Sequence, residues 1–373
     1  MVKLVAQVKL RPTPEQAASL GATIRRANEA CEWLSTKAWE AKVFRQFALH
    51  KLAYYECRAA FPDLSSQVVA RSIAKVAAAY KLDRLTKRRF RPLGSIAYDA
   101  RILSWKGDAA NLWTLSGRQT IPFVCGDRQR ALLDHERGES DLVLRDSEFY
   151  LLVSVEVPEA DEKKVGDWLG VDVGIVNIAT TSDGANFSGA HLNSLRRRAN
   201  RLRQRLQTKG TKSAKRLLRK RRMKESRFSR HVNHCISKQI VASAERTVRG
   251  IALENLDGIR TRIRASRSQR RVLHSWAFAD LHLKIAYKAA RAGLPVCYVD
   301  PRNTSRECRV CGHTEKANRK TRGIFSCLAC GHTTDADVNA ARVIARRAEV
   351  IRPYAGNVEV VVSHGVDLQS SGL

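Results

Sequence analysis

The sequence predicts a multidomain α/β protein: an N-terminal β-barrel with a helical insertion, then an α/β domain that is interrupted by a small cysteine-rich ribbon. Three observations predict this fold class. Short strand-like segments lie on both sides of a helical stretch within the first 160 residues. Further along, two apolar strand-like segments each carry a single carboxylate. Two Cys-x-x-Cys pairs then precede a last helical segment.

Residues 2–10 alternate apolar with polar or basic side chains, which is typical of a half-buried strand. A helix is expected to begin at Thr13-Pro14-Glu15-Gln16, because Thr13 can cap it and Gln16 holds the capping-box position. Helical spacing continues over residues 44–60 and 64–85, so residues 13–87 are predicted to form a helical insertion. Ser65, Ser66 and Gln67 open its last helix, where the serines are expected to cap it and Gln67 could face a ligand.

From residue 88 onward the sequence pattern changes from helical spacing to short strand-like segments separated by turns. With residues 1–12, the segment 88–160 is predicted to form one small barrel. Barrels of this kind often bind nucleic acid, although the fold alone does not establish it. The expected strands are Ile96–Tyr98, Ile102–Trp105, Leu112–Leu115, Gln119–Val124, Asp141–Arg145 and Phe149–Val157, with turns at Lys106-Gly107-Asp108, Ser116-Gly117 and Arg137-Gly138.

A second domain is predicted over residues 164–302 and 334–352. Residues 168–181 are expected to form a strand, a turn permitted by Gly174 and a second strand, with Asp172 in the middle of the apolar stretch. Ile251-Ala-Leu-Glu-Asn-Leu is expected to form another apolar strand, with Glu254 near its end. A carboxylate in such a strand is costly unless it is paired or binds a metal ion. Asp337 stands where the last helix begins; there an ordinary N-cap is the alternative role. Two strands and the start of a helix thus each carry one carboxylate. This is the layout of an RNase H-like nuclease, in which such groups hold two Mg²⁺ ions.

The cysteine pairs Cys308/Cys311 and Cys327/Cys330 have the spacing of a zinc ribbon, predicted over residues 303–333. Four thiolates would fill a tetrahedron around one structural Zn²⁺. Two disulfides or four unrelated buried thiols are the alternatives. His313 and His332 follow the two pairs and could replace a ligand, but with four cysteines present they are expected outside the ligand set.

The chain is strongly basic, with 67 Lys and Arg against 36 Asp and Glu and a net charge of +31. Such an imbalance favours a polyanionic partner, and nucleic acid is the leading class. A membrane surface is the alternative, but no apolar span or lipidation signal supports it. The first fifteen residues match neither a signal nor a transit peptide, and the nine cysteines suit a reducing compartment. A cytoplasmic location is therefore expected.

Residues 196–230 hold seventeen Lys or Arg residues against one acid, Glu225. An apolar stripe from Leu192 to Leu206 predicts that this segment is a docked helix, followed by a second helix over 213–244. The basic side chains on such a helix surface would repel one another unless phosphate groups neutralise their charge. The candidate phosphate contacts are Arg196, Arg197, Arg201, Arg205, Arg219 and Arg222. A second basic run is expected in a loop with Arg260, Arg262, Arg264, Arg267, Arg270 and Arg271, and residues 353–373 are expected to form a loosely ordered tail.

Several stretches together resemble the TnpB family, insertion-sequence proteins long described as transposases and related to compact type V CRISPR effectors. They span most of the chain: VKLRPTPEQ, the Ser-Gln helix around Gln67, LGVDVGIVNIA, ALENLDGI, VDPRNTSRECRVCG and FSCLACGHTTDADVNAA. The resemblance implies a RuvC-like nuclease with Asp172, Glu254 and Asp337 as its acids; of the two late aspartates, Asp337 matches because Val-Asn-Ala-Ala follows it. One departure is Val176, where the family often carries a basic residue.

The family is implied to be an RNA-guided DNA endonuclease of mobile elements. A wedge-like barrel and a helical recognition lobe, with Gln67 among its nucleic-acid contacts, would hold a guide RNA and read a short motif beside the DNA target. The expected partners are one guide RNA and a DNA target in double- and single-stranded form, bound by a monomer. Two other functions stay open: a guide-independent, structure-selective RuvC-like nuclease, and a nuclease-inactive RNA-guided repressor.

Overall fold

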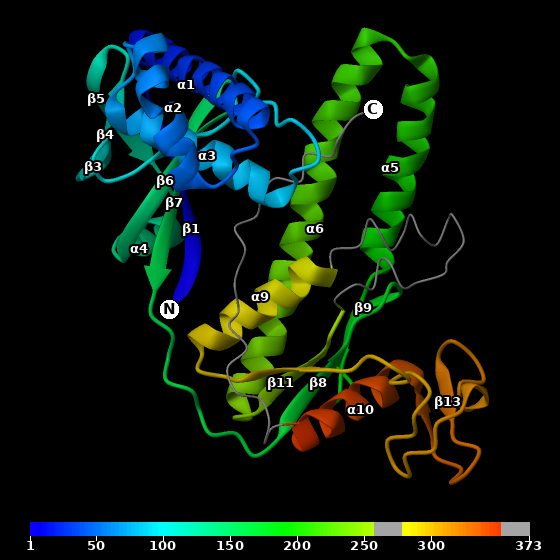
Figure 1. The fold of residues 1–373 in the computed structure, drawn as a ribbon. Coiled ribbons are helices and arrows are strands. Elements are labelled where there is room, and N and C mark those ends of the chain that lie inside the picture. The colour runs from blue at the N-terminus through cyan, green and yellow to red at the C-terminus, as the bar shows by residue number, and fades with distance from the viewer. Residues whose placement is uncertain (257–277, 352–373) are drawn as a thin grey trace. The chain divides into compact units, whose positions relative to one another are not determined.

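The computed structural model describes residues 1–256 and 278–351, apart from the side chains of Arg222 and Met223. The described chain divides into two compact units between Val157 and Pro158 (Figure 1). The predicted tail over 353–373 lies outside the described residues. So does the second basic run, with Arg260, Arg262, Arg264, Arg267, Arg270 and Arg271. The finer division into domains that the sequence suggests stays a prediction.

A seven-stranded sheet with the order β2-β6-β7-β1-β5-β4-β3 forms the first unit and confirms the predicted barrel with its helical insertion. The first strand of the chain lies in the middle of this sheet, where Lys9 pairs with Val124 of β5. Residues 2–10 therefore lie between two strands, β5 and β7, that begin only at Gly117 and Glu148. The strands are β1 (Val2–Leu10), β2 (Ile96–Tyr98), β3 (Leu103–Lys106), β4 (Ala109–Thr114), β5 (Gly117–Val124), β6 (Glu136–Arg145) and β7 (Glu148–Val157).

Three helices are inserted between β1 and β2, as expected: α1 (Pro14–Ala41), α2 (Gln46–Ala60) and α3 (Ser66–Leu82). The caps predicted at Thr13 and Ser65 are confirmed, whereas Ser66 is the first residue of α3 and is not its cap. The Thr13 side chain accepts from the Gln16 backbone N–H while the Gln16 side chain accepts from the Thr13 N–H, and the Ser65 side chain accepts from the Val68 N–H. Such caps satisfy backbone donors that the first helical turn leaves without partners.

One prediction for the barrel is wrong, and one element was not predicted. Arg137-Gly138 does not end a strand; it lies inside β6, where the pairing with β7 shifts register between Arg137 and Ser140. A β-bulge of this kind keeps the strand continuous although a glycine interrupts its apolar pattern. The segment before β6 also forms a short helix, α4 (Asp127–Leu133), which the sequence analysis did not predict.

A five-stranded sheet with the order β10-β9-β8-β11-β12 forms the centre of the second unit. Numbered along the chain, its strands take the order 3-2-1-4-5, with β9 and β10 joined antiparallel and β11 and β12 added parallel to β8. The strands are β8 (Trp168–Asp172), β9 (Asn177–Thr181), β10 (Asn186–Ser188), β11 (Gly250–Glu254) and β12 (Val296–Val299). The predicted RNase H-like sheet is thus confirmed.

Helices cover both faces of this sheet. One face packs on α6 (Lys212–Arg246) and α9 (Phe278–Arg291), through residues such as Ile240 and Ile285. The other face packs on α10 (Ala336–Ile351), through Ile344 and Ala348 (Figure 1). Beyond the sheet, α5 (Ala190–Lys209) pairs with α6, and the cysteine-rich segment between β12 and α10 contains η1 (Lys316–Asn318), β13 (Ile324–Ser326) and β14 (Thr333–Asp335).

Candidate functional site

Asp172 and Glu254 leave the sheet side by side. They end the neighbouring parallel strands β8 and β11, in which Val171 pairs with Leu253. Side chains alternate between the faces of a strand, and Val171 and Leu253 both lie in the core under α6 and α9. The carboxylates that follow them therefore project toward the opposite face, the one covered by α10. Such an edge at the carboxyl ends of parallel strands is where α/β proteins commonly bind ligands.

Helix α10 brings Asp337 to the same place because it lies very close to β8. A Cβ atom on Gly170 would fall 1.9 Å from the Ala341 carbonyl oxygen, so only glycine at this position lets α10 approach β8 so closely. Asp337 lies one helical turn before Ala341, and Asp172 lies two residues after Gly170. The close crossing of strand and helix thus directs the third acid toward the other two.

The two late aspartates have different contacts. Asp335 Oδ1 accepts from the backbone N–H of Asp337 at 2.9 Å and of Val338 at 3.0 Å, so Asp335 caps α10. The Asp337 carboxylate accepts from Asn177 Nδ2 at 2.9 Å through Oδ2, and from Arg319 at 3.2 Å through Oδ1. Asp337 therefore belongs to the cluster of acids, while Asp335 supports the helix that carries it.

The electrostatics of the acids reflect how close they are. Burial raises the pKa of Asp172 to about 7, with further contributions from the negative charges of Glu254 and Asp337, while the Arg319 guanidinium acts in the opposite direction. Burial also raises the pKa of Glu254, against the hydrogen bond from Thr304 and the charge of Arg347. Glu254 is buried, and Asp172 and Asp337 are partly buried. Among the described residues, the one cation bonded to these acids is Arg319, which pairs with Asp337; negatively charged carboxylates this close are unfavourable without a further cation. Their hard oxygen donors suit Mg²⁺, so the residues fit the predicted metal.

Three residues that the sequence analysis did not assign support the acids. Thr304, 4% exposed, donates its hydroxyl to Glu254 Oε1 at 2.6 Å. Asn177 holds Asp337 from β9, and Arg319 reaches Asp337 from the cysteine-rich segment. Asn177 and Thr304 lie within stretches that resemble the family, so that likeness was the available signal. Nothing in the sequence marks Arg319 among its basic neighbours.

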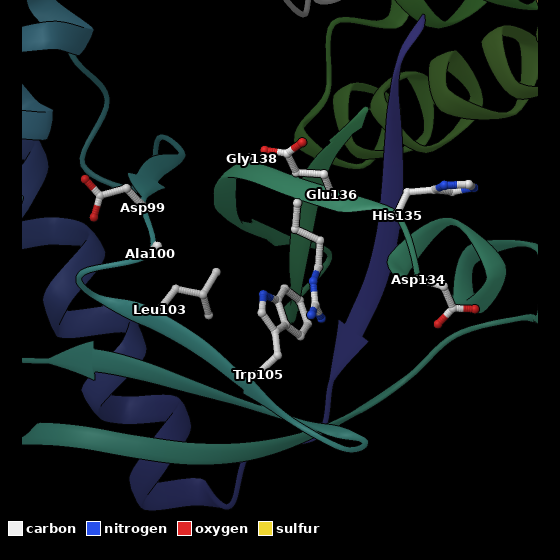
Figure 2. A pocket seen from close by; sticks show the side chains of 9 residues that line it. Asp99, Ala100, Leu103, Trp105, Asp134, His135, Glu136 and Gly138 are labelled. Carbon is white, nitrogen blue, oxygen red and sulfur yellow. The ribbon is translucent and has the colours of Figure 1, made fainter. Parts of the chain in front are cut away.

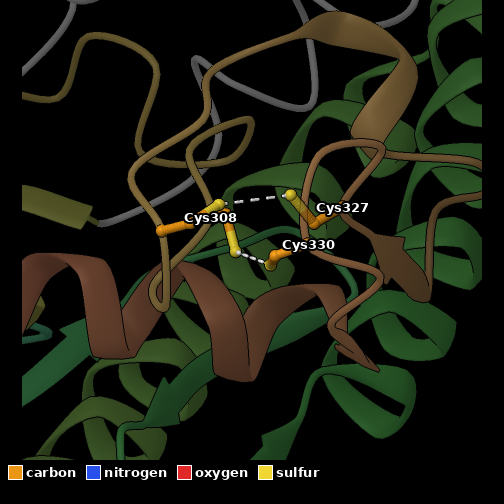
Figure 3. A group of neighbouring side chains, drawn as sticks. Cys308, Cys327 and Cys330 are labelled. Atoms are coloured by element: carbon orange, nitrogen blue, oxygen red, sulfur yellow. Dashed lines mark hydrogen bonds between the residues drawn. The ribbon is translucent and has the colours of Figure 1, made fainter.

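The four predicted cysteines converge, and Figure 3 shows Cys308, Cys327 and Cys330 among them. The Sγ atoms of Cys308, Cys311, Cys327 and Cys330 all lie within 4.8 Å of one another, with Cys308 and Cys330 at 3.7 Å and Cys311 and Cys327 at 3.5 Å. A tetrahedron of Zn–S bonds places its sulfurs about 3.8 Å apart, so the geometry fits Zn²⁺. All four are free thiols, so the alternative of two disulfides does not describe the structure.

Local backbone geometry explains the convergence. Each pair closes a tight turn in which Gly312 and Gly331 take φ values of 77° and 72°, a left-handed conformation that favours glycine. Backbone N–H groups of Cys330 and Ala329 point at the Cys327 sulfur and lower the pKa of this thiol to about 6. At Cys327 the thiolate form that binds metal ions is therefore favoured.

The cysteine cluster is tied to α10 by a buried asparagine. Asn339 Nδ2 donates to the Glu307 carbonyl oxygen at 2.7 Å, and Asn339 Oδ1 accepts from the Arg309 backbone N–H at 3.2 Å. The Glu307 carboxylate in turn pairs with Arg346 and Arg347 of the same helix. These contacts fix the ribbon against the helix that presents Asp337.

The candidate phosphate contacts on α5 and α6 are not equivalent. Arg196 is only 8% exposed, one of its guanidinium nitrogens lies 3.4 Å from Ser229 Oγ of α6, and burial lowers its pKa. It packs the two helices together, so its predicted role at a phosphate does not match its place in the fold. The side chain of Arg222 lies outside the described residues. The exposed candidates are Arg197, Arg201, Arg205 and Arg219.

A pocket in the first unit is lined by residues of two segments, 99–105 and 134–138 (Figure 2), and Gln67 contacts one of these residues. Its side-chain amide donates to Asp99, which lines the pocket, and its carbonyl oxygen accepts from Arg101 at 3.1 Å. The Arg137 guanidinium lies 5.5 Å from the centre of the Trp105 ring, and both residues line the pocket. The role of Gln67 in binding nucleic acid stays a prediction.

Two family models match the chain, mainly within the second unit. The OrfB_IS605 family, described as "Probable transposase", matches residues 151–260, and "Cas12f1-like, TNB domain" matches residues 278–344. No helix among the described residues could span a membrane.

Among curated relatives, the CRISPR-associated endodeoxyribonuclease Cas12f1 of Sulfoacidibacillus thermotolerans is 41% identical over 125 residues, which cover 33% of this chain and 28% of the relative. A TnpB-like protein of Methanocaldococcus jannaschii is 32% identical over 122 residues, 32% of this chain and 43% of the relative. These alignments span less than half of either relative. Among solved structures, the "Cas12f1-sgRNA-target DNA complex" aligns with a TM-score of 0.59 at 15% identity, covering 88% of this chain and 83% of that one. That likeness shows the fold.

Proposed function

Since the chain belongs to the TnpB-like family of OrfB-type transposases and is related to Cas12f proteins, we propose that it is an RNA-guided DNA endonuclease of a mobile element. It would hydrolyse DNA phosphodiesters with Mg²⁺ next to a short flanking motif. The observation that carries the proposal is the convergence of Asp172, Glu254 and Asp337 at one edge of the sheet. Three carboxylates this close have no use in a protein that only binds nucleic acid.

Mg²⁺ would be held by Asp172, Glu254 and Asp337, and bound there it would activate a water molecule and stabilise the leaving oxygen. The chain's own residues set the geometry. Thr304 fixes one oxygen of Glu254, and Asn177 orients Asp337. Arg319 adds a positive charge beside the acids, where negative charge develops on the phosphate during hydrolysis.

Sequence selectivity would come from a bound RNA. The exposed arginines of α5 and α6 suit phosphates, which position a nucleic acid but carry little base information. Base pairing between a guide RNA and the target strand supplies that information in proteins of this kind. Two relatives support the same conclusion: one is named a CRISPR-associated endodeoxyribonuclease, and the other is a Cas12f1 solved in complex with an sgRNA and target DNA.

The test is to purify the protein with its RNA, sequence that RNA, and exchange its 3′ segment. We expect a structured RNA whose new 3′ segment redirects cleavage, while the required flanking motif stays the same because the barrel reads it. RNA-free protein that cuts DNA with the same site preference would instead indicate a guide-independent, structure-selective nuclease. Guided binding without cleavage in Mg²⁺ would indicate a nuclease-inactive repressor.

A further inference from the structure

Helix α2 turns an aromatic stripe toward solvent. Its buried side consists of Leu49, Ala53 and Cys57, spaced every four residues. Phe47, Lys51 and Tyr55 have the same spacing and lie on the opposite side of the helix. The two rings are 88% and 83% exposed. Burying an aromatic ring away from water is favourable. Two such rings on one exposed stripe therefore indicate a binding surface.

Neighbouring rings hold one end of this stripe in place. The Tyr54 ring stacks on His50 with their centres 4.5 Å apart and also meets Tyr55 edge-on at 5.2 Å. Tyr55 thus presents its ring on a supported platform, with little freedom to lose when a ligand binds.

The charge around the stripe is positive. Lys51 lies between the two rings and Arg45 directly precedes the helix; neither side chain forms an ion pair within the described part of the chain. The only acid of α2, Glu56, is already paired with Lys37 at 2.7 Å. The exposed surface therefore alternates ring, cation, ring, with no free carboxylate of its own helix.

We propose that Phe47, Lys51 and Tyr55 bind unpaired nucleotides, whose bases stack on the two rings while Lys51 contacts a phosphate. Stacking on aromatic side chains beside basic ones is how proteins bind single strands without reading sequence. The rings lie about 12 Å apart along the helix, too far for one base to touch both, so each would take a separate base. Paired bases within a duplex do not expose their faces, so duplex segments would not use this stripe.

A second copy of the chain fits the stripe less well. In a symmetric contact Lys51 and Arg45 of one copy would approach the same residues of the other, and like charges across an interface are unfavourable. The proposal rests on the proposed function, since a guide RNA and an opened DNA target are the two sources of unpaired nucleotides. It can still be tested without guided cleavage.

The experiment compares full-length variants freed of RNA. Binding is measured to oligo(U) and oligo(dT) of twenty nucleotides and to a duplex of the same length; 2-aminopurine in the single strands reports stacking. We expect the Phe47→Ala/Tyr55→Ala double variant to bind both single strands about 10- to 100-fold more weakly and to lose the stacking signal, with unchanged duplex binding. Phe47→Tyr/Tyr55→Phe keeps both rings and should behave as the wild type. Leu52→Ala, which alters an exposed residue of the same helix, is the matched control.

Unchanged single-strand affinity in the double alanine variant, at an unchanged melting temperature, would overturn the proposal. So would a dimer of the wild type, seen by sedimentation, that the double variant abolishes. A loss confined to oligo(U) would assign the stripe to RNA, and one confined to oligo(dT) to the DNA strand. Failure of guide exchange to redirect cleavage would reject the proposed function and leave these binding results standing.

Discussion

The acid cluster and the α5–α6 pair each gather charge of one sign, but they are built in opposite ways. The carboxylates are few and partly or wholly buried, and hydrogen bonds from Thr304 and Asn177 hold two of them. The seventeen basic residues of 196–230 lie mainly on exposed helix surfaces, and one ion pair, Arg203 with Glu225 at 3.1 Å, satisfies the only acid among them. In the acid cluster the position of each carboxylate determines its function, whereas on α5 and α6 the total positive charge does. Single substitutions should therefore have very different effects in the two.

The largest effect is expected at the third acid. Asp337→Ala should lower DNA cleavage in Mg²⁺ by about 10³-fold or more, because it removes a proposed metal ligand from groups that act as a unit. RNA and DNA binding should stay nearly unchanged, as should binding in Asp172→Ala and Glu254→Ala, which should be equally inactive. Asp335→Ala is the matched control. It should lose only a helix cap, about 1 kcal/mol of stability, and keep most activity. Plasmid cleavage rates measure activity, and filter binding measures RNA and DNA affinity. An active Asp337→Ala variant together with an inactive Asp335→Ala variant would show that Asp335, not Asp337, is the third acid.

The ribbon should come next, because it acts on the acids only through α10. We expect one Zn²⁺ per chain in pure protein, and none in Cys327→Ser, whose cleavage rate should fall by about 10²-fold as Asp337 moves out of place. Cys235→Ser, an exposed cysteine of α6, should keep both zinc and activity. Elemental analysis and melting temperature are the measurements. Wild-type protein without zinc would contradict this expectation.

The pH dependence of stability should reveal the raised pKa of Asp172. Its folded pKa of about 7 lies above its ordinary value of 3.8, so between these pH values the folded state binds more protons than the unfolded chain. The free energy of unfolding without Mg²⁺ should therefore fall as pH rises from 4 to 7. Asp172→Asn should remove this fall and be more stable than the wild type at pH 8, by on the order of a few kcal/mol, with the difference gone near pH 4.

Asp183→Asn provides a control of opposite sign. The hydrogen bond from Arg249 lowers the pKa of Asp183, so this carboxylate stabilises the fold above pH 4, and the variant should be less stable than the wild type at pH 8. Urea denaturation between pH 4 and 8 measures both differences. Parallel curves for the wild type and Asp172→Asn would show that Asp172 ionises normally in the folded protein.

How much the sequence could predict follows from the range of the interactions. The apolar runs of β8 and β11, each with one carboxylate, are local patterns, and they suffice to single out Asp172 and Glu254. That both acids lie on one face depends on how the two strands pair. The cysteine spacing likewise predicts the metal-binding turns. Arg319 could not be found, because its approach to Asp337 depends on how the ribbon folds back. The burial of Arg196 also escaped prediction, since a stripe of leucines shows which side of a helix docks but not which charged neighbour is covered.

The smallest effect should come from one exposed arginine, and the pair Arg196 and Arg197 makes it measurable. Arg197→Glu changes an exposed side chain, so it should weaken nucleic-acid binding a few-fold, lower the slope of log K against log salt by about one, and leave the melting temperature unchanged. Arg196→Glu places a carboxylate where Arg196 packs α5 on α6, so it should lower the melting temperature first. Reversing Arg197, Arg201, Arg205 and Arg219 together should add their separate effects on the salt slope, because exposed charges act nearly independently. Equal salt slopes for Arg197→Glu and the wild type would show that this surface carries no phosphate contacts.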